Sequence, residues 1–292
     1  MDILITGCAG FIGSNLARAL QNGNRLFGYD NFSTGRKENL KGVKIQLVKD
    51  ISKLKPKIIF HLGMPSSSPI YREDRYKIID GIKVSIDVFE LAKNAGAKVV
   101  YASSSSLYNG NAPPYREDMP IKITDFYTET RYFIERIAQL YSQFYGITTI
   151  GLRLFSVYGP NDAGKGKYAN IITQFALAMA AGKRPVIYGD GRQTRDFIHV
   201  DDVVTAFLLA AKYNKTDIFN VGTGEEHSFN DVVAMINKLL KKNIKPQYRT
   251  NPIKNYVDRT WADTSKSEKL LGFKARYSFE TGISRYLVRI MK

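Results

Sequence analysis

The chain has 292 residues, of which 44% are hydrophobic and 24% are charged, and it contains a single cysteine. This composition excludes an intrinsically disordered chain, and one cysteine excludes an internal disulfide. The formal net charge is +16, but lysines and arginines are scattered along the chain, without zinc-finger spacing or an RNA-binding aromatic signature. We therefore expect a basic surface that attracts an anionic ligand, and no nucleic-acid partner.

No hydrophobic run approaches the ~20 residues that cross a bilayer. The N-terminus has no basic region before its apolar stretch, so we expect neither a signal peptide nor a membrane partner. The single cysteine also fits a reducing compartment, and we predict a cytoplasmic protein. Cys8 lies inside a glycine-rich turn and is interpreted as a small filler, since no histidine is near it in sequence.

The N-terminal stretch predicts an anion site. A short apolar run at residues 3–5 indicates a strand that is buried on both faces, and residues 11–20 are typical of a helix. Gly7, Gly10 and Gly13 lie between and within them. In this context the backbone N–H groups and the helix dipole point at one place, and the missing side chains let a pyrophosphate approach closely. The alternative is a glycine-rich turn without a ligand.

A second strand at residues 25–29 ends at Asp30, at roughly the twenty-residue distance where dinucleotide folds carry a ribose-binding acid. A carboxylate accepts hydrogen bonds from a 2′-hydroxyl and repels a 2′-phosphate, so Asp30 favours NAD over NADP. An aspartate that opens the loop 31–35 is the alternative. Arg36 and Lys37 lie close by, so NADP stays open.

Strands alternate with helices over the first half of the chain. The further strands are predicted at residues 44–48, 57–62, 98–102 and 147–154, and the helices at 76–94 and 124–145. This alternation predicts an α/β fold with a doubly wound parallel sheet of the Rossmann type. Right-handed crossovers place the carboxyl ends of the strands at one edge, where ligands bind. The glycine turn, Asp30, Leu62, Gly63 and the serines at 103–106 all belong to that edge.

The pattern becomes less regular after residue 154. Residues 161–167 are polar and contain glycine, which predicts a mobile binding loop. Asp201 or Asp202 is expected to cap a helix that ends at Ala211. A further strand is predicted at residues 218–221, and helices at 171–181, 229–240 and 279–290. We expect residues 1–160, with 197–222 returning to them, to form a dinucleotide-binding domain, and residues 161–196 and 223–292 a smaller substrate-binding α/β part.

Three features coincide in this chain: the glycine turn, the serines that follow the fifth strand, and a Tyr127-x-x-x-Arg131 pair on the next helix. With the other landmarks they resemble the extended short-chain dehydrogenase/reductases, in particular the nucleotide-sugar epimerases of the UDP-glucose 4-epimerase type. The other landmarks are Asp30-Asn31, Asp50-Ile51, His61-Leu62-Gly63, Arg153-Leu154-Phe155, Tyr158-Gly159-Pro160, Arg195-Asp196-Phe197-Ile198-His199-Val200 and Trp261-Ala262-Asp263. The resemblance covers nearly the whole chain.

The resemblance implies an NAD-dependent epimerase of a nucleotide sugar, with UDP-glucose and UDP-galactose as its substrates. The sugar would be oxidised at C4 and reduced on its other face, so that NAD stays bound. Tyr127 matches the base that takes the proton of the sugar hydroxyl, and Ser104 matches the hydroxyl that hydrogen-bonds to the reacting oxygen. A phenol has an ordinary pKa of about 10, so a base of this kind needs a cation close by, as Arg131 could provide.

The resemblance also implies binding residues, a homodimer that forms through the helices at 76–94 and 124–145, and no metal. The residues implied for NAD are Gly7, Gly10, Phe11, Ile12, Gly13, Asp30, Asn31, Asp50, Ile51, Leu62, Gly63, Ser103, Tyr127 and Arg131. The residues implied for the nucleotide-diphosphate sugar are Ser105, Ser156, Asn170 and Arg195. Arginine suits the diphosphate because its guanidinium is a forked, always-charged donor.

Three positions depart from the family pattern. Arg131 stands where the family has a lysine that contacts the nicotinamide ribose, and this exchange is not conservative. Gly81 stands where an asparagine is usual, and Ser156 stands where some epimerases carry another asparagine. Slowed, retuned or absent catalysis stays open, whereas NAD binding should survive.

Several alternatives are weighed against the epimerase. A sugar 4,6-dehydratase needs an Asp-Glu pair where this chain has Ser105 and Ser106, so it is disfavoured. A heptose epimerase resembles residues 251–263 equally well, and a one-way reductase would need exchangeable NADP, against Asp30. A non-catalytic NAD-binding protein is motivated by Arg131. Tyr127 could otherwise be an interior tyrosine, and the hydroxyl of Ser104 could satisfy backbone groups.

Overall fold

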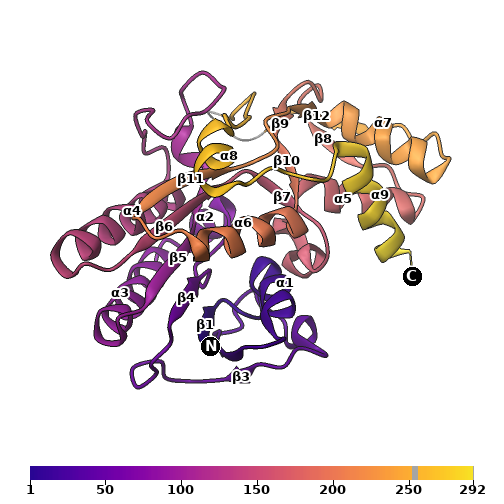
Figure 1. The fold of residues 1–292 in the computed structure, drawn as a ribbon. Helices are drawn as coiled ribbons and strands as arrows, with labels where there is room; N and C mark the ends of the chain where they lie inside the picture. Colours follow the sequence, from indigo (N-terminus) through magenta and orange to yellow (C-terminus); the bar gives the residue numbers. More distant parts are fainter. Residues whose placement is uncertain (252–255, 292) are drawn as a thin grey trace.

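The computed structural model describes residues 1–251 and 256–291. Its centre is a sheet of seven parallel strands. The strands are β1 (Asp2–Thr6), β2 (Arg25–Tyr29), β3 (Gln46–Leu47), β4 (Ile58–His61), β5 (Lys98–Ser104), β6 (Thr149–Leu154) and β11 (Asp217–Val221). Their order is β11-β6-β5-β4-β1-β2-β3 (Figure 1). The chain thus winds outward from β1 in both directions, which confirms the predicted doubly wound sheet.

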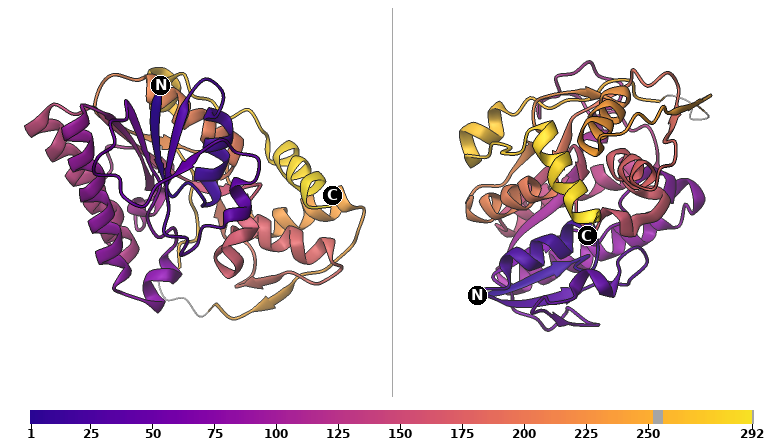
Figure 2. Two further views of the ribbon diagram at one scale, coloured as in Figure 1. Left: turned by 90° about the horizontal axis from the view of Figure 1, so that it is seen from below. Right: turned by 90° about the vertical axis from the view of Figure 1, so that its right-hand side faces the viewer.

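Helices cover both faces of the sheet (Figures 1 and 2). Side chains alternate along a strand, so β1 sends Ile3 and Ile5 to one face and Leu4 to the other. The first face packs on α1 (Phe11–Leu20) and α6 (Val200–Lys212), and the second on α3 (Lys77–Ala95) and α4 (Phe126–Tyr145). Both faces are therefore apolar, as the continuous apolar runs of the strands predict.

Three local predictions differ from the structure. The strand expected at 44–48 is reduced to Gln46–Leu47, whose exposed side chains lie at the edge of the sheet beside β2 alone. The predicted aspartate cap of α6 is wrong: the N-cap residue is His199, whose Nδ1 accepts a hydrogen bond from Asp201 N at 3.2 Å. Residues 162–168 form a 3₁₀ helix, η3 (Asp162–Tyr168), where an irregular loop was expected.

The later part of the chain has its own apolar core between three helices, α5 (Ile171–Ala180), α7 (Phe229–Leu240) and α9 (Phe279–Ile290). Two-stranded sheets accompany it: β8 (Val186–Tyr188) with β13 (Gln247–Arg249), and β9 (Thr194–Arg195) with β12 (His227–Ser228). A third, β7 (Ser156–Tyr158) with β10 (Phe197–His199), lies between the parts. The remaining elements are α2 (Ser68–Glu73), α8 (Ser265–Leu271), η1 (Lys37–Leu40) and η2 (Ser105–Tyr108). The domain boundaries themselves stay a prediction.

A buried ion pair fixes helix α4 to the sheet. The Arg153 guanidinium, from β6, lies 2.8 Å from the Glu135 carboxylate of α4, and both side chains are only 3% exposed. Glu135 also accepts a hydrogen bond of 2.5 Å from the Ser103 hydroxyl at the end of β5. Arg153 in turn donates to the Tyr108 hydroxyl at 2.8 Å. Because every charged group here has partners, α4 is held in one orientation over the ends of β5 and β6.

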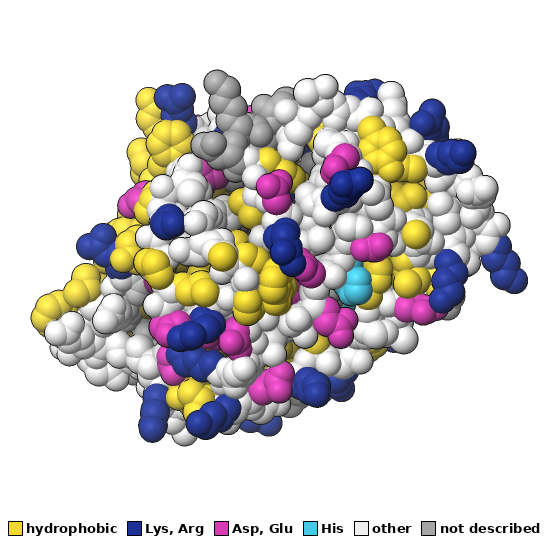
Figure 3. All heavy atoms as spheres, turned by 90° about the horizontal axis from the view of Figure 1, so that it is seen from above, with side chains coloured by type: hydrophobic (Ala, Val, Ile, Leu, Met, Phe, Trp, Pro, Cys, Tyr) yellow, Lys and Arg dark blue, Asp and Glu magenta, His cyan; other side chains and the backbone are white. Residues whose placement is uncertain are grey.

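On the face drawn in Figure 3, lysine and arginine side chains are interspersed with aspartate and glutamate. None of the helices in residues 1–251 and 256–291 has the length and apolarity that crossing a bilayer requires.

Cys8 is fully buried, and burial raises the pKa of its thiol to about 12. Its thiol is therefore protonated at neutral pH, which agrees with the interpretation of Cys8 as a small residue that fills space in the turn.

Candidate active site

A cavity of about 820 Å³ opens at the carboxyl edge of the sheet. It lies where the strand-to-helix connections after β1, β2, β4 and β5 meet the start of α4. Of the residues predicted for the site, those that line the cavity are Gly7, Gly10, Phe11, Ile12, Gly13, Asp30, Asn31, Leu62, Gly63, Ser103, Ser104, Ser105, Tyr127, Arg131, Ser156, Asn170 and Arg195. Segments far apart in sequence therefore share one site, as the predicted sheet edge requires.

Asp50 and Ile51 are not among the cavity-lining residues. The Asp50 carboxylate accepts hydrogen bonds from Ser52 N at 2.8 Å and from Ser52 Oγ at 2.9 Å, and these bonds lower the pKa of Asp50. Ile51 is 7% exposed and packs in the core on the α3 side of the sheet. Their role in cofactor binding thus stays a prediction that no contact in the structure supports.

One end of the cavity is formed by the glycine turn. Gly7 has φ +68°, and a Cβ there would lie 2.7 Å from the Leu62 carbonyl carbon, so no other residue fits without a shift. The N-cap residue of α1 is Gly10, and no described side chain caps that helix. The first N–H groups of α1 are therefore left for a ligand. Asp30 lies beside them and accepts a hydrogen bond from Ala9 N at 2.8 Å.

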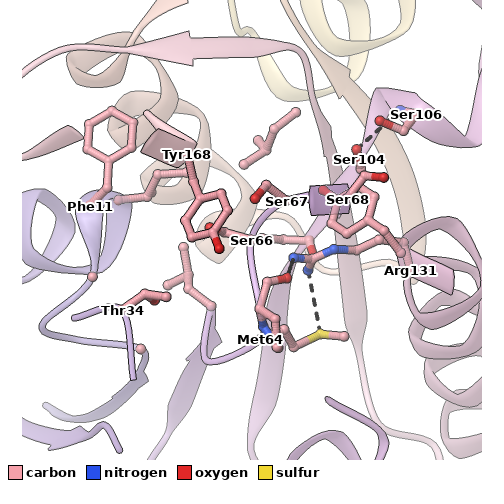
Figure 4. Close-up of a pocket in the computed structure, with 18 of the residues that line it drawn as sticks. Phe11, Thr34, Met64, Ser66, Ser67, Ser68, Ser104, Ser106, Arg131 and Tyr168 are labelled. Atoms are coloured by element: carbon pink, nitrogen blue, oxygen red, sulfur yellow. Dashed lines mark hydrogen bonds between the residues drawn. The ribbon is translucent and has the colours of Figure 1, made fainter. Parts of the chain in front are cut away.

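The other end holds the predicted catalytic groups. Tyr127 lies in the first turn of α4 and is 8% exposed, and Ser104 ends β5 at 6%. The Ser104 hydroxyl accepts a hydrogen bond from Ser106 N at 3.1 Å, which leaves its proton for another acceptor. Figure 4 shows Ser104 and Arg131 on one side of the pocket and Phe11 on the opposite side. The α4 capping box at Asp125 fixes where the helix, and thus Tyr127, begins.

Arg131 joins the ends of two strands. One terminal nitrogen of its guanidinium donates to the Ala102 carbonyl of β5 at 3.0 Å, and the other to the Pro65 carbonyl at 2.9 Å. The guanidinium carbon lies 5.0 Å from the centre of the Tyr127 ring. Its Nε is buried and has no hydrogen-bond partner among the described residues. The fork of arginine thus fixes two backbone segments and keeps a cation beside the phenol.

Gly81, the second departure from the family pattern, lies outside the cavity lining. It is buried in α3, and a Cβ at this position would lie 2.8 Å from the Thr130 side chain of α4. The Met64 methyl and the Tyr71 hydroxyl are the next neighbours of that Cβ position, at 3.5 and 3.6 Å. The glycine therefore serves the close packing of α3 on α4 immediately beside Arg131.

His61 is excluded as an acid or base. Its Nδ1 lies 2.7 Å from the Thr6 hydroxyl and its Nε2 lies 3.1 Å from the Ser85 hydroxyl, so both ring nitrogens are engaged. Burial, together with the nearby Arg131 cation, lowers the pKa of His61 to about 3. The neutral imidazole instead ties β1, β4 and α3 together beneath the cavity floor.

The predicted substrate residues come from the later part of the chain. Asn170 caps α5 and donates from its amide nitrogen to the Ser156 hydroxyl at 2.9 Å, so these two residues act as a unit. Arg195 lies on β9, with its guanidinium carbon 5.1 Å from the centre of the Tyr256 ring. Its neighbour Asp196 has a structural role, because it accepts hydrogen bonds from the backbone of Thr223 and Ala262.

Several cavity-lining residues were missed by the sequence analysis. Among them are Thr34, Met64, Pro65, Ser66, Ser67, Ser68, Arg72, Asp125, Tyr168, Tyr256 and Val257. The serines at 66–68 directly follow β4, so their place after a strand was a usable signal. Lys165 lies in the binding loop expected at 161–167, whereas Tyr168 and Tyr256 follow no strand end, and only the tertiary fold brings them to the cavity.

The residues present fit a dinucleotide. The uncapped start of α1 offers N–H groups for a diphosphate, and the Asp30 carboxylate offers acceptors for ribose hydroxyls. Arg131 lines the opposite end of the cavity beside Tyr127. None of these groups requires a metal ion as a bridge, and the described residues contain no cluster of three or more potential metal ligands.

Comparison with known proteins agrees with this geometry. A sequence profile of the NAD dependent epimerase/dehydratase family matches residues 3–222. The chain is 31% identical to the UDP-glucose 4-epimerase of Mycolicibacterium smegmatis, over 98% of this chain and 97% of the relative. It is similar in structure to the UDP-glucose 4-epimerase of Thermotoga maritima, solved with UDP-glucose, at a TM-score of 0.94 and 28% identity, covering 100% and 99% of the chains.

A second solved structure contains the cofactor. It is the UDP-glucuronic acid 4-epimerase of Bacillus cereus in complex with UDP-glucuronic acid and NAD, with a TM-score of 0.89, 25% identity and coverage of 100% and 99%. The profile match alone spans well over half of the chain, and the relatives match it from end to end. The chain therefore belongs to the NAD dependent epimerase/dehydratase family and is an NAD-dependent nucleotide-sugar epimerase.

Proposed function

We propose that the protein interconverts UDP-glucose and UDP-galactose by inverting C4 of the sugar. The observation that carries this proposal is that Tyr127, Ser104 and Arg131 line the same cavity as the glycine turn and Asp30. A sugar held between Tyr127 and the dinucleotide would have the base beside the hydroxyl of one carbon. The hydride acceptor would lie beside that same carbon. The cavity of about 820 Å³ lies in the usual range of ligand sites and reaches from the glycine turn to Tyr127 and Arg195.

The residues divide the chemical work as follows. Tyr127 takes the proton of the C4 hydroxyl, and the Arg131 guanidinium carbon lies 5.0 Å from the centre of its ring. When bound, NAD supplies the transient oxidation by accepting a hydride from C4 and returning it. The Ser104 hydroxyl donates to the sugar oxygen and orients it. The sugar must turn between the two half-reactions, so only the nucleotide diphosphate is held firmly, with Arg195 and Asn170 as its partners.

Replacing Tyr127 by phenylalanine should remove the base and leave the dinucleotide site intact. We expect Tyr127→Phe to lower kcat by about 10²–10⁴-fold, the usual contribution of a positioned general base, while purified protein still carries NAD. Steady-state kinetics and cofactor analysis check this. Tyr71→Phe is the matched control, because Tyr71 packs edge-on against Tyr127 at 5.8 Å but does not line the cavity. Equal activity in Tyr127→Phe and wild type would refute the assignment.

The surroundings of residue 131 suit an arginine. A lysine has a single ammonium group and cannot reproduce two parallel donors that hold Ala102 and Pro65 from different nitrogens. The Met64 sulfur lies 3.5 Å from one terminal nitrogen of the guanidinium, and a Cβ at Gly81 would lie 3.5 Å from the Met64 methyl group. We infer that the site is adapted to arginine, and that the family's lysine would fit it poorly.

The variant Arg131→Lys should therefore lose activity. Loss of one charge-assisted hydrogen bond in the cavity wall predicts a fall in kcat/KM of about tenfold or more. The measurement is kcat/KM together with the dissociation constant of NAD, compared with Arg25→Lys, the same exchange in the exposed Arg25–Asp2 ion pair outside the cavity lining. A gain of activity in Arg131→Lys would instead mean that arginine is a handicap in this chain.

A uronic-acid substrate is the second candidate. The solved structure from Bacillus cereus holds UDP-glucuronic acid, and in this chain Arg72 of α2 lines the cavity without a hydrogen bond or ion pair to any described residue. A guanidinium is a good partner for a sugar carboxylate. UDP-glucose remains the first choice because the proposed chemistry at C4 needs no carboxylate, and Arg72 is largely exposed to solvent.

A substrate panel with product analysis decides between these functions. We expect UDP-galactose and UDP-glucose to be interconverted with the highest kcat/KM, ahead of UDP-glucuronate, UDP-N-acetylglucosamine and an ADP-heptose. A preference for UDP-glucuronate that disappears in Arg72→Gln would establish the second candidate. Bound NAD without turnover of any nucleotide sugar would favour a non-catalytic NAD-binding protein.

Helices α3 and α4 lie side by side at one edge of the molecule (Figure 2). Their outer faces carry large exposed apolar residues: Ile79 is 60% exposed, Ile86 39%, Leu140 41% and Phe144 68%. Leu140 and Phe144 are four residues apart and share one helix face. We propose that two copies of the chain pack these faces together as a homodimer.

A charge on this face should break the dimer. We expect wild type to have the mass of a dimer in solution and Leu140→Glu to have that of a monomer, because a glutamate cannot be buried unpaired in an apolar interface. Light scattering after size exclusion gives the mass. Leu270→Glu on α8 is the matched control, since Leu270 is 43% exposed and lies away from both helices. A dimeric Leu140→Glu would place the interface elsewhere.

A further inference from the structure

The segment 161–168, which we name the strap, runs across the cavity mouth. Its first residue, Asn161, has φ +74°, and Gly166 inside η3 has φ +58° and ψ −125°. The Asn161 amide donates to the Ser14 hydroxyl of α1 at 3.0 Å, and the Asn15 amide donates to the Pro160 carbonyl at 2.8 Å. One end of the strap is thus fixed to the helix that follows the glycine turn.

The other end of the strap is fixed to α2, on the opposite side of the cavity. Lys167 Nζ lies 2.7 Å from the Glu73 carboxylate, and the Tyr168 hydroxyl donates to the second oxygen of the same carboxylate. These two bonds lower the pKa of Glu73, so the carboxylate is charged at neutral pH. Figure 4 shows Tyr168 between Phe11 and Ser66, inside the pocket. The strap therefore joins the segment that follows β1 to the segment that follows β4.

Lys165 is the residue of the strap that faces the glycine turn. It lines the cavity, its side chain is 18% exposed, and its Nζ lies 5.6 Å from the centre of the Phe11 ring at the start of α1. Nζ is 3.2 Å from an oxygen of Asp162, whose side chain is fully buried. The other Asp162 oxygen accepts from Asn170 N at 2.7 Å. This pairing holds the ammonium near the ring of Phe11, the first residue of α1.

We propose that Lys165 binds the diphosphate of NAD and that Glu73 latches the strap over the bound dinucleotide, so that this segment sets how slowly NAD leaves. The proposal rests on the dinucleotide site described above and not on the identity of the sugar. A diphosphate carries negative charge on both phosphates, and Lys165 adds a full positive charge to the N–H groups of α1.

Slow release has a direct chemical benefit here. The epimerase reaction returns the hydride to the sugar that supplied it, so the cofactor needs no exchange between turnovers. If the dinucleotide left between the two half-reactions, the oxidised sugar would be stranded. A closed strap prevents that loss, and its two fixed ends at α1 and α2 allow opening without unfolding the sheet.

Cofactor dissociation tests the role of Lys165. Lys165→Met keeps the length of the side chain and removes the charge. We expect the dissociation constants of NAD and of ADP-ribose, which keeps the diphosphate and lacks the nicotinamide, both to rise about tenfold, and the difference from wild type to shrink at high salt. Fluorescence or calorimetric titration of the full chain gives these values. Unchanged binding of both ligands would overturn the assignment.

Charge reversal at Glu73, compared with the same change in a matched ion pair, tests the latch. Glu73→Lys places a cation opposite Lys167, and we expect NAD to dissociate about threefold faster or more, an effect of the size that exposed ion pairs show. Glu280→Lys is the control, because the Lys238–Glu280 pair has nearly the same exposure, 63% and 46% against 67% and 52%, far from the cavity. Stopped-flow displacement of prebound NADH measures the rate.

The outcomes separate the two proposals. Equal release rates in Glu73→Lys and wild type would overturn the latch, and thermal melts of the NAD-free variants identify any loss of folding. Bound NAD with no sugar turnover would refute the proposed substrate and leave the strap proposal standing. A wild-type protein that binds neither NAD nor ADP-ribose would overturn the dinucleotide site and the strap together.

Discussion

The structure depends on the parallel register of its central strands. Thr6 of β1 pairs with His61 of β4, so these two strands end at the same level, whereas β5 continues past Tyr101, the partner of His61, to Ser104. Each connection that leaves the sheet there begins beside its neighbour. The approach is so close that the backbone at Leu62 leaves no room for a Cβ on Gly7. A ligand-binding edge is the direct consequence of this register.

A second constraint holds helix α4 to that edge. The Glu135 and Arg153 side chains form an ion pair with almost no solvent access, and Ser103 and Tyr108 satisfy their remaining hydrogen bonds. Leaving one partner of such a pair alone in a protein interior costs about 3–5 kcal/mol. Because Tyr127, Arg131 and Glu135 follow each other at one-turn intervals on α4, this pair also fixes the phenol and the guanidinium relative to β5.

The exchange of lysine for arginine acquires a physical explanation in this setting. From the sequence, Arg131 and Gly81 were two independent departures from a family pattern. In the structure they belong to one packing arrangement, in which Gly81 lets α3 approach Thr130 and Arg131 binds the carbonyls of Ala102 and Pro65. The strap adds a comparable case, since a polar loop in the sequence becomes a connection between α1 and α2.

The sequence by itself determined the α/β class, the order of the major helices and strands, and the strand-end residues of the site. These features follow from local patterns: apolar runs, glycine spacing and the place of polar residues after a strand. It did not determine that His199 caps α6, that the Asp50 carboxylate binds Ser52, or that Lys167 and Tyr168 bind Glu73 of α2. Those facts depend on contacts between residues far apart in the chain, or on competition between neighbouring side chains for one backbone group. Only the tertiary structure decides such contacts, because no local pattern encodes which distant partner is in reach.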